Sequence, residues 1–277
     1  MNISWHPPDQ LEAAVRTRLV PSGVLVDIGC GIRPQRLATP VVHVCCEPFA
    51  DYARRLQDEV ISSSERTFLV LGLTWKQALD VLPEKSVDSV FLLDVIEHLE
   101  KEEGAELLRR TERLARRQVV LFTPLGFVPQ VHPDGIDAWG MRGGAWQEHK
   151  SGWNPEDFDE SWEILASRAF HTTDSLGKPL AEPAGAFFAV KTFSEVADVP
   201  RRRLAREVFV EAMAVEDPET LLRGGEVFRD AVHDSHAFVR LPRWVAAPRR
   251  RLAALIRRYT SDRSRPAPAD GERRHGG

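Results

Sequence analysis

The sequence predicts an α/β fold whose mostly parallel sheet has seven strands, the last of them antiparallel, followed by a C-terminal helical extension. Three observations support this prediction. Apolar runs alternate with amphipathic stretches from residue 23 to residue 124. The runs are continuously apolar, which is typical of parallel strands covered on both faces. The last two runs are joined by a loop too short for a crossover helix, which indicates an antiparallel pair.

Five apolar runs predict the parallel strands, at 23–28, 41–46, 67–72, 86–96 and 118–124. The stretches between them predict helices, at 33–38, 49–60, 75–82 and 102–117. In the first of these helices Pro34 would occupy the first turn, where its missing N–H has no partner to lose.

After residue 124 the pattern changes. Residues 125–153 are rich in Gly, Pro and Trp without a clear period, which predicts a long ordered insertion of functional importance. Asn154 and Pro155 predict an N-capped helical turn over 154–160. The two closing strands are expected at 162–170 and 185–193. Charged helices are then expected at 201–215, 218–232 and 243–259, and disorder from residue 261.

The predicted domain organisation follows from these changes in pattern. We expect an α/β domain over residues 1–194 that contains the insertion at 125–160, a helical extension over 195–260 and a disordered basic tail over 261–277.

The charge is unevenly distributed. Residues 238–277 hold eleven arginines and three acidic residues, a net charge of +8, so the rest of the chain carries −12 of the total of −4. An acidic body disfavours nucleic acid as a partner. The segment at 243–259 pairs apolar residues with clustered arginines, so either weak contact with an anionic membrane surface or docking on the acidic body is expected of it.

The cysteines and the N-terminal residues indicate a cytoplasmic protein. Cys30, Cys45 and Cys46 match no disulfide, metal or redox spacing, so we interpret them as small buried apolar residues. Residues 1–10 lack a basic region followed by an apolar core, and no apolar run reaches about 18 residues.

Three strand ends carry polar signals: "VDIGCG" after the first strand, "CCEP" after the second and "LLDVIEHL" at the fourth. Ligands of open parallel sheets bind at the carboxyl ends of the strands. Gly29 and Gly31 match the first half of the dinucleotide fingerprint, but Pro34 stands where its third glycine would be. The sequence thus raises the question of which ligand needs the first half of this fingerprint and not the second.

In this order and at these spacings the three segments resemble the class I S-adenosylmethionine-dependent methyltransferases, over roughly residues 15–193. The resemblance implies a Rossmann-like sheet with a reversed last strand and S-adenosyl-L-methionine as cofactor. The family often has glycine where this chain has Arg33.

The resemblance also implies roles for individual residues. Gly29 and Gly31 would let the backbone approach the cofactor, and Asp27 would lie near its amino group. Glu47 would accept hydrogen bonds from both ribose hydroxyls. Leu73 or Thr74 would contact adenine, although the family's frequent acidic residue is missing there. The segment "DVIEH", which begins at Asp94, would line the methionine side and the mouth of the acceptor pocket.

A hydroxyl acceptor also needs a base, for which the candidates are His98, His132 and His149. The insertion holds Trp139, Trp146 and Trp153, which either form an acceptor lid or close a small satellite core. No metal site is predicted, because His132, Asp134 and His149 do not have the spacing of a ligand set.

The predicted function is transfer of a methyl group from S-adenosyl-L-methionine to a small-molecule or saccharide acceptor, by O-methylation. The segment "HKSGWNPEDF" at 149–158 resembles one in bacterial family members that accompany cell-surface glycan assembly. No Asn-Pro-Pro-Tyr-like motif of the amino-methylating members follows the fourth strand. Two alternatives are an NAD(P)-dependent oxidoreductase and a non-catalytic protein that binds S-adenosylmethionine. The sequence does not determine the oligomeric state.

Overall fold

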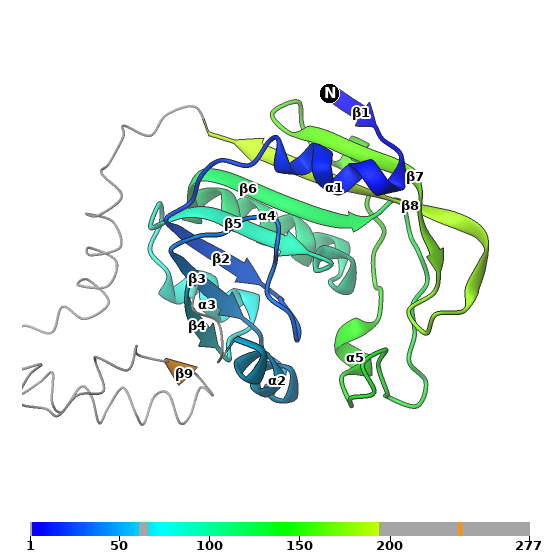
Figure 1. Ribbon diagram of the computed structural model, residues 1–277, viewed down its shortest axis with the longest axis horizontal. Helices are drawn as coiled ribbons and strands as arrows, with labels where there is room; N and C mark the ends of the chain where they lie inside the picture. The colour runs from blue at the N-terminus through cyan, green and yellow to red at the C-terminus, as the bar shows by residue number, and fades with distance from the viewer. Residues whose placement is uncertain (1, 61–65, 194–237, 240–277) are drawn as a thin grey trace, which may run out of the picture. The chain divides into compact units, whose positions relative to one another are not determined.

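The structure is a computed structural model that describes residues 2–60, 66–193 and 238–239 (Figure 1). The helices predicted at 201–215, 218–232 and 243–259 lie outside these residues, as does the tail over 261–277. The predicted division after residue 194 and the proposed membrane contact fall there too. None of the helices in the described part of the chain is both long enough and apolar enough to span a bilayer.

A single sheet organises the described residues, and its strand order is β1-β7-β8-β6-β5-β2-β3-β4-β9. The strands are β1 (Asn2–Trp5), β2 (Val24–Ile28), β3 (Val42–Cys46), β4 (Thr67–Leu71), β5 (Val87–Leu93), β6 (Ala115–Pro124), β7 (Glu163–Thr173), β8 (Pro179–Thr192) and β9 (Phe238–Val239). β8 runs antiparallel to both of its neighbours, and the short β9 runs antiparallel to β4, whereas all other pairs are parallel.

This topology confirms the predicted fold class, including the seven predicted strands and the reversal of the last of them. The sheet differs from the prediction at its edges, where β1 and β9 bring the number of strands to nine. β1 was missed because a four-residue strand before two prolines carries little local signal. It exists through its parallel pairing with β7.

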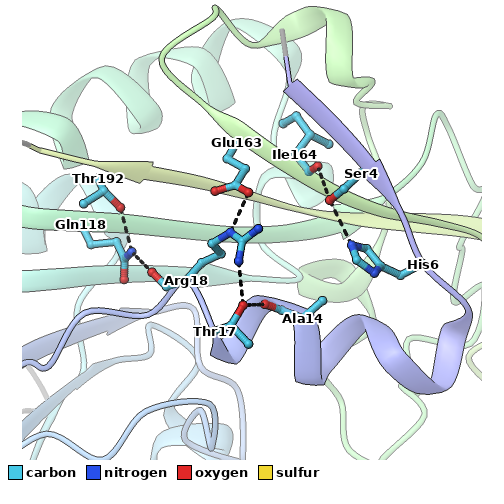
Figure 2. A network of polar contacts seen from close by, with 9 residues as sticks. All are labelled: Ser4, His6, Ala14, Thr17, Arg18, Gln118, Glu163, Ile164 and Thr192. Carbon is cyan, nitrogen blue, oxygen red and sulfur yellow. Dashed lines mark hydrogen bonds and ion pairs between the residues drawn. The ribbon is translucent and has the colours of Figure 1, made fainter.

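Side-chain hydrogen bonds connect the N-terminal segment to β6 and β7 (Figure 2). The Ser4 hydroxyl donates to the carbonyl of Ile164 at 3.4 Å, and Arg18 Nε donates to Glu163 at 2.6 Å. The side-chain amide of Gln118 donates to the Arg18 carbonyl at 2.7 Å. These contacts tie β1 and the helix after it to β6 and β7.

Helices cover both faces of the sheet (Figure 1). They are α1 (Pro8–Arg16), α2 (Ala50–Val60), α3 (Trp75–Val81) and α4 (Lys101–Leu114). Alternate strand residues face opposite layers. Val26 and Leu92 join the core cluster that includes α3 and α4, whereas Leu25 and Phe91 join the cluster that includes α1. The continuous apolar runs in the sequence therefore reflect strands buried on both sides.

The helix predicted at 33–38 is absent, so this prediction was wrong. The chain there is held in an irregular path by the Asp27 carboxylate, which accepts a hydrogen bond from the Gln35 backbone N–H at 2.8 Å. The Gln35 side chain both donates to and accepts from the backbone of Ala38. These bonds replace the backbone hydrogen bonds that a helix would supply.

The other predicted helices are present with shifted ends. α4 stops at Leu114, not at residue 117, because Ala115 already pairs with Val87 as the first residue of β6. The insertion holds only a four-residue helix, α5 (Gly144–Gln147), and the turn predicted at 154–160 is a short 3₁₀ helix, η2 (Pro155–Asp157). Asn154 occupies the N-cap position of η2 as predicted, and its backbone N–H donates to Oδ2 of Asp157 at 2.7 Å.

Candidate functional site

A cavity of about 480 Å³ opens at the carboxyl ends of β2, β5 and β6. Its volume lies in the range of small-molecule sites. The hairpin between β7 and β8 and the segment 128–149 form the other walls. The lining includes seven of the ten residues that the sequence put forward: Asp27, Gly29, Gly31, Asp94, His98, His132 and His149. Leu73, Thr74 and Glu47 are not part of the lining.

The glycine turn after β2 has the conformation that its sequence predicts. Gly29 and Gly31 have φ values of +68° and +58°, in the left-handed region that residues with a Cβ rarely adopt. A Cβ on Gly29 would lie 3.0 Å from the side chain of Val95, and one on Gly31 would lie 2.8 Å from the Trp139 ring. The turn therefore needs glycine at both positions, and the second glycine lies directly under a tryptophan of the insertion.

Asp27 is buried at the end of β2. Its Oδ2 accepts hydrogen bonds from the Gln35 backbone N–H and lies 3.2 Å from Nε2 of His43, a fully buried residue of β3. Burial by itself would lower the pKa of His43, but hydrogen bonds to Asp27 and Cys45 and the negative charge of both groups together raise it to about 9. Asp27 thus supports the chain after the glycine turn and also borders the cavity.

Glu47 follows β3 and reaches the glycine turn. Its Oε2 accepts a hydrogen bond from the Gly31 N–H at 2.9 Å, and its Oε1 accepts one from the Phe49 N–H at 2.8 Å. Burial raises the pKa of this carboxyl to about 7, against the opposing effect of both backbone hydrogen bonds. A carboxylate offers about four lone pairs, so two remain for a ligand's hydroxyl groups.

Leu73 and Thr74 follow β4, as the sequence predicts, but lie away from the cavity lining. Thr74 is the N-cap of α3, and its hydroxyl accepts a hydrogen bond from the Gln77 N–H at 3.3 Å. Leu73 packs against the main core cluster. An adenine contact from these two residues stays a prediction.

The segment after β5 turns sharply into the cavity. Asp94 has a φ of +54°, an uncommon conformation for a residue other than glycine. It leads into the short 3₁₀ helix η1 (Ile96–His98). Glu97 is only 2% exposed, and its Oε2 accepts a hydrogen bond from the Thr123 hydroxyl at 2.9 Å. Burial raises the pKa of Glu97 to about 7.

The three histidines that the sequence offered as bases gather at one side of the cavity. The His98 and His149 rings lie 5.0 Å apart between centroids, and burial lowers the pKa of each to about 4, so both are neutral at pH 7. Nδ1 of His98 lies 3.1 Å from the Glu148 carbonyl, and Nδ1 of His149 lies 2.6 Å from that of Val128. His132 is 6% exposed.

Glu97 and His171 are among the lining residues that sequence reasoning did not put forward as individual candidates. Glu97 was included only as part of the segment "DVIEH", although its position one residue before His98 is a usable signal. His171 lies near the end of β7 and borders the same cavity. Nothing in the local pattern of that strand singles it out, because its position depends on how far the hairpin bends over the sheet.

The tryptophans of the insertion divide between the two predicted roles. Trp153 belongs to the core: its ring is buried against α4 at Gly104, and its Nε1 donates to the Ile96 carbonyl at 3.2 Å. Trp139 borders the cavity above the glycine turn, whereas Trp146 is 46% exposed. The insertion is thus both a small core and a cavity wall.

A buried pair fastens the insertion to α2. The Tyr52 hydroxyl donates to Oδ2 of Asp137 at 2.5 Å, and backbone N–H groups of the segment 139–143 donate to the same carboxylate. Burial by itself would raise the pKa of Asp137, but these hydrogen bonds hold the pKa below its usual value. The Tyr52 and Trp139 rings also meet edge to face, with centroids 4.9 Å apart.

Of the three cysteines, Cys45 and Cys46 are buried and Cys30 is half-buried, and all three are free thiols. The interpretation of Cys45 and Cys46 as small buried residues is confirmed. Cys30 also borders the cavity between the two glycines of the turn.

Comparison with known proteins finds no matching family model and no matching curated protein. The solved structures that resemble this one include several methyltransferases. The methyltransferase domain of bacterial CtHen1 is 15% identical over 68% of this chain and 100% of that one, with a TM-score of 0.40. Magnesium protoporphyrin IX methyltransferase from Synechocystis PCC 6803 with bound SAH is 21% identical over 66% and 81%, also with a TM-score of 0.40.

A SAM-dependent methyltransferase from Archaeoglobus fulgidus is 14% identical over 68% of this chain and 95% of that one, with a TM-score of 0.41. At these values the likeness is a general one, and the fold assignment depends on the strand order. That order defines a Rossmann-like α/β protein whose last predicted strand is reversed.

Proposed function

We propose that this protein is an S-adenosylmethionine-dependent methyltransferase that methylates a hydroxyl group of a small molecule or saccharide. One observation carries the proposal: the glycine turn, supported by Glu47, and the three histidines border two sides of one cavity. A cofactor corner and a proton-accepting corner are therefore held on the same rigid sheet, within reach of one bound acceptor.

The residues around the glycine turn fit S-adenosylmethionine. The left-handed glycines allow close backbone approach, and Glu47 keeps two lone pairs for the ribose diol next to the turn. Asp27 borders the cavity on the same side, where a carboxylate suits the cofactor's ammonium group. When bound, the cofactor supplies a methyl group already activated by its sulfonium.

The chain's own residues would perform the remaining tasks. Trp139 covers the glycine turn and excludes water from the cofactor corner. We assign the proton-accepting role to His132, whose Nε2 has no hydrogen-bond partner among the described residues. The polar groups and the aromatic ring of the insertion suit an acceptor that has both a flat face and hydroxyl groups.

The irregular path of residues 33–38 favours this proposal over an NAD(P)-dependent oxidoreductase. A dinucleotide's pyrophosphate is bound by the N-terminus of a helix that directly follows the glycine turn. Here no helix follows, and the Gln35 N–H that would face a phosphate is occupied by Asp27. Two buried carboxylates beside the turn, Asp27 and Glu47, would also repel a phosphate.

Calorimetric titration with S-adenosylhomocysteine and with NADH tests the assignment. We expect S-adenosylhomocysteine to bind with a micromolar or lower Kd, and NADH not to bind. The reverse result would replace the proposal with the oxidoreductase alternative. Consumption of S-adenosylmethionine in the presence of a panel of saccharides and hydroxylated aromatics then separates an enzyme from a non-catalytic binding protein.

A further inference from the structure

Glu97, His98 and His149 form a compact cluster at the cavity wall. One possible ligand atom from each residue lies within 4.8 Å of the others. Glu97 and His98 lie on η1, directly after β5, and His149 comes from the far end of the insertion after β6. All three border the cavity, so an ion among them would be accessible to a bound acceptor.

The two rings of this cluster are oriented by the backbone. Nδ1 of His98 faces the Glu148 carbonyl and Nδ1 of His149 faces the Val128 carbonyl. A carbonyl only accepts hydrogen bonds, so each Nδ1 carries the proton and each Nε2 keeps its lone pair. Metal-bound histidines are held in the same way, with the far ring nitrogen donating to a carbonyl or carboxylate.

Glu97 provides an independent sign of a missing partner. The side chain is 2% exposed and its Oε2 accepts a hydrogen bond from Thr123, whereas its Oε1 has no donor among the described residues. The buried carboxyl of Asp94 interacts with Glu97, and burial together with this acidic neighbour raises the pKa of Asp94. A buried carboxylate oxygen without a donor or cation is costly. A cation bound between Glu97 and the two free Nε2 atoms would remove that cost.

We propose that Glu97, His98 and His149 bind one divalent transition-metal ion. Two imidazoles and one carboxylate are the ligands of several catalytic zinc sites, which leave a position open for substrate. Imidazole donors favour Zn²⁺ and its first-row neighbours over Mg²⁺ and Ca²⁺, which take oxygen ligands. The sequence did not predict this site, because it considered His149 with His132 and Asp134 and not with Glu97.

The role of this ion in catalysis rests on the proposed function. An acceptor hydroxyl bound at the open position would become more acidic. Its proton would pass to Nε2 of His132 while the oxygen forms a bond to the methyl carbon. The carbon–sulfur bond would break with its electron pair remaining on sulfur, so S-adenosylhomocysteine would leave and the sulfonium charge would be neutralised.

A second cluster, Asp27, His43 and Cys45, has similar spacing but is already engaged. Nε2 of His43 lies 3.2 Å from Asp27, and its Nδ1 lies 3.3 Å from the Arg66 guanidinium. His43 and Cys45 are fully buried in the sheet. A metal-binding experiment must still show which of the two clusters holds the ion. Cys45 makes this possible, because a thiolate ligand changes the spectrum of a bound metal.

The test uses the full chain without an affinity tag, freed of metal by a chelator and then dialysed. Titration with Zn²⁺ by calorimetry is expected to show one ion per chain. We expect His149→Ala and His98→Ala to weaken binding by at least about tenfold, and Glu97→Gln to weaken it by a similar factor. His171→Ala removes another cavity histidine that lies outside the cluster and should leave zinc affinity unchanged.

Cobalt provides the second readout. Co²⁺ bound by nitrogen and oxygen ligands gives visible bands without a thiolate charge-transfer band, which is the expected spectrum. A thiolate band would place the ion at Cys45 and overturn the proposal. Absence of stoichiometric Zn²⁺ binding by the wild-type protein would also overturn it, as would an equal loss of affinity in His171→Ala.

Titration of the same metal-free samples with S-adenosylhomocysteine separates the two proposals. Binding of S-adenosylhomocysteine without binding of Zn²⁺ overturns the metal site alone. Binding of Zn²⁺ at the cluster without binding of S-adenosylhomocysteine supports the metal site and contradicts the proposed function.

Discussion

The backbone N–H of Gly31 donates a hydrogen bond of 2.9 Å to Oε2 of Glu47, joining the turn after β2 to the end of β3. The two residues are 16 positions apart in the chain. This contact places a buried carboxylate beside the glycine turn, where the proposed function puts the ribose of the cofactor. The first predictions concern this pair.

Replacing Glu47 by alanine should weaken binding of S-adenosylhomocysteine by about 1.5–3 kcal/mol, because hydrogen bonds to a charged group are lost. Isothermal titration calorimetry measures the effect directly. Glu182→Gln, at an exposed position of β8, is the matched control and should bind as the wild type does. An unchanged affinity in Glu47→Ala would remove the ribose assignment.

Affinity for S-adenosylhomocysteine should rise as the pH increases through about 7, the pKa of Glu47 in the free protein. Because this pKa is raised, the carboxyl is largely protonated below pH 7, and only the ionised form can accept from both ribose hydroxyls. Binding should therefore release a proton near neutral pH. Calorimetry in buffers with different ionisation enthalpies measures that release.

Neighbouring groups support the assignment of this pH dependence to Glu47. Asp27 is the charged neighbour that acts on it, whereas Cys30, Cys46 and Tyr52 have raised pKa values and stay neutral. In Glu47→Gln the pH dependence should flatten. A wild-type affinity that stays constant from about pH 6 to about pH 8 would contradict the prediction.

Gly31→Ala should lower both stability and affinity for S-adenosylhomocysteine. The alanine would have to adopt a backbone φ of +58°, and its Cβ would lie 2.8 Å from the Trp139 ring. The backbone strain alone costs about 1–3 kcal/mol. Thermal unfolding and calorimetry measure the two effects.

Gly135→Ala is the matched control for this variant. Gly135 also has a positive φ, +73°, but a Cβ there would meet no atom within 4 Å. The control should therefore lose stability through strain while its affinity for S-adenosylhomocysteine stays unchanged. Equal losses of affinity in both variants would mean that the turn around Gly31 has no special role in binding.

Tyr52→Phe should loosen the insertion, because it removes the hydroxyl that donates to Asp137. Loss of one hydrogen bond to a buried charged group costs about 1.5–3 kcal/mol. Limited proteolysis within residues 126–143 should become faster, as local opening becomes easier. Trp146→Phe, a change at a partly exposed position just after this segment, should leave the cleavage rate unchanged. Equal rates in Tyr52→Phe and the wild type would show that this hydrogen bond does not hold the insertion.

Much of the fold was predictable because its signals are local. An apolar run in the sequence predicts each strand between residues 23 and 193. The two glycines after the first strand predict the turn, because Gly29 and Gly31 have positive φ values that few other residues adopt. One local signal gave a wrong prediction. Residues 33–38 favour a helix by composition, but the Gln35 N–H donates to the Asp27 carboxylate and the segment stays irregular. The edge strand β1 has almost no signal of its own and depends on β7.

The sequence by itself determined the strand order along the chain, the glycine turn and the acidic residue at the second strand's end, since each follows from short-range periodicity and backbone geometry. Only the tertiary structure decided which distant side chains meet. Tyr52 and Asp137 are 85 residues apart, and the contact between the His98 ring and the Glu148 carbonyl spans 50. Such pairs arise because parallel strands bring their carboxyl ends to one edge of the sheet, whatever their separation in sequence.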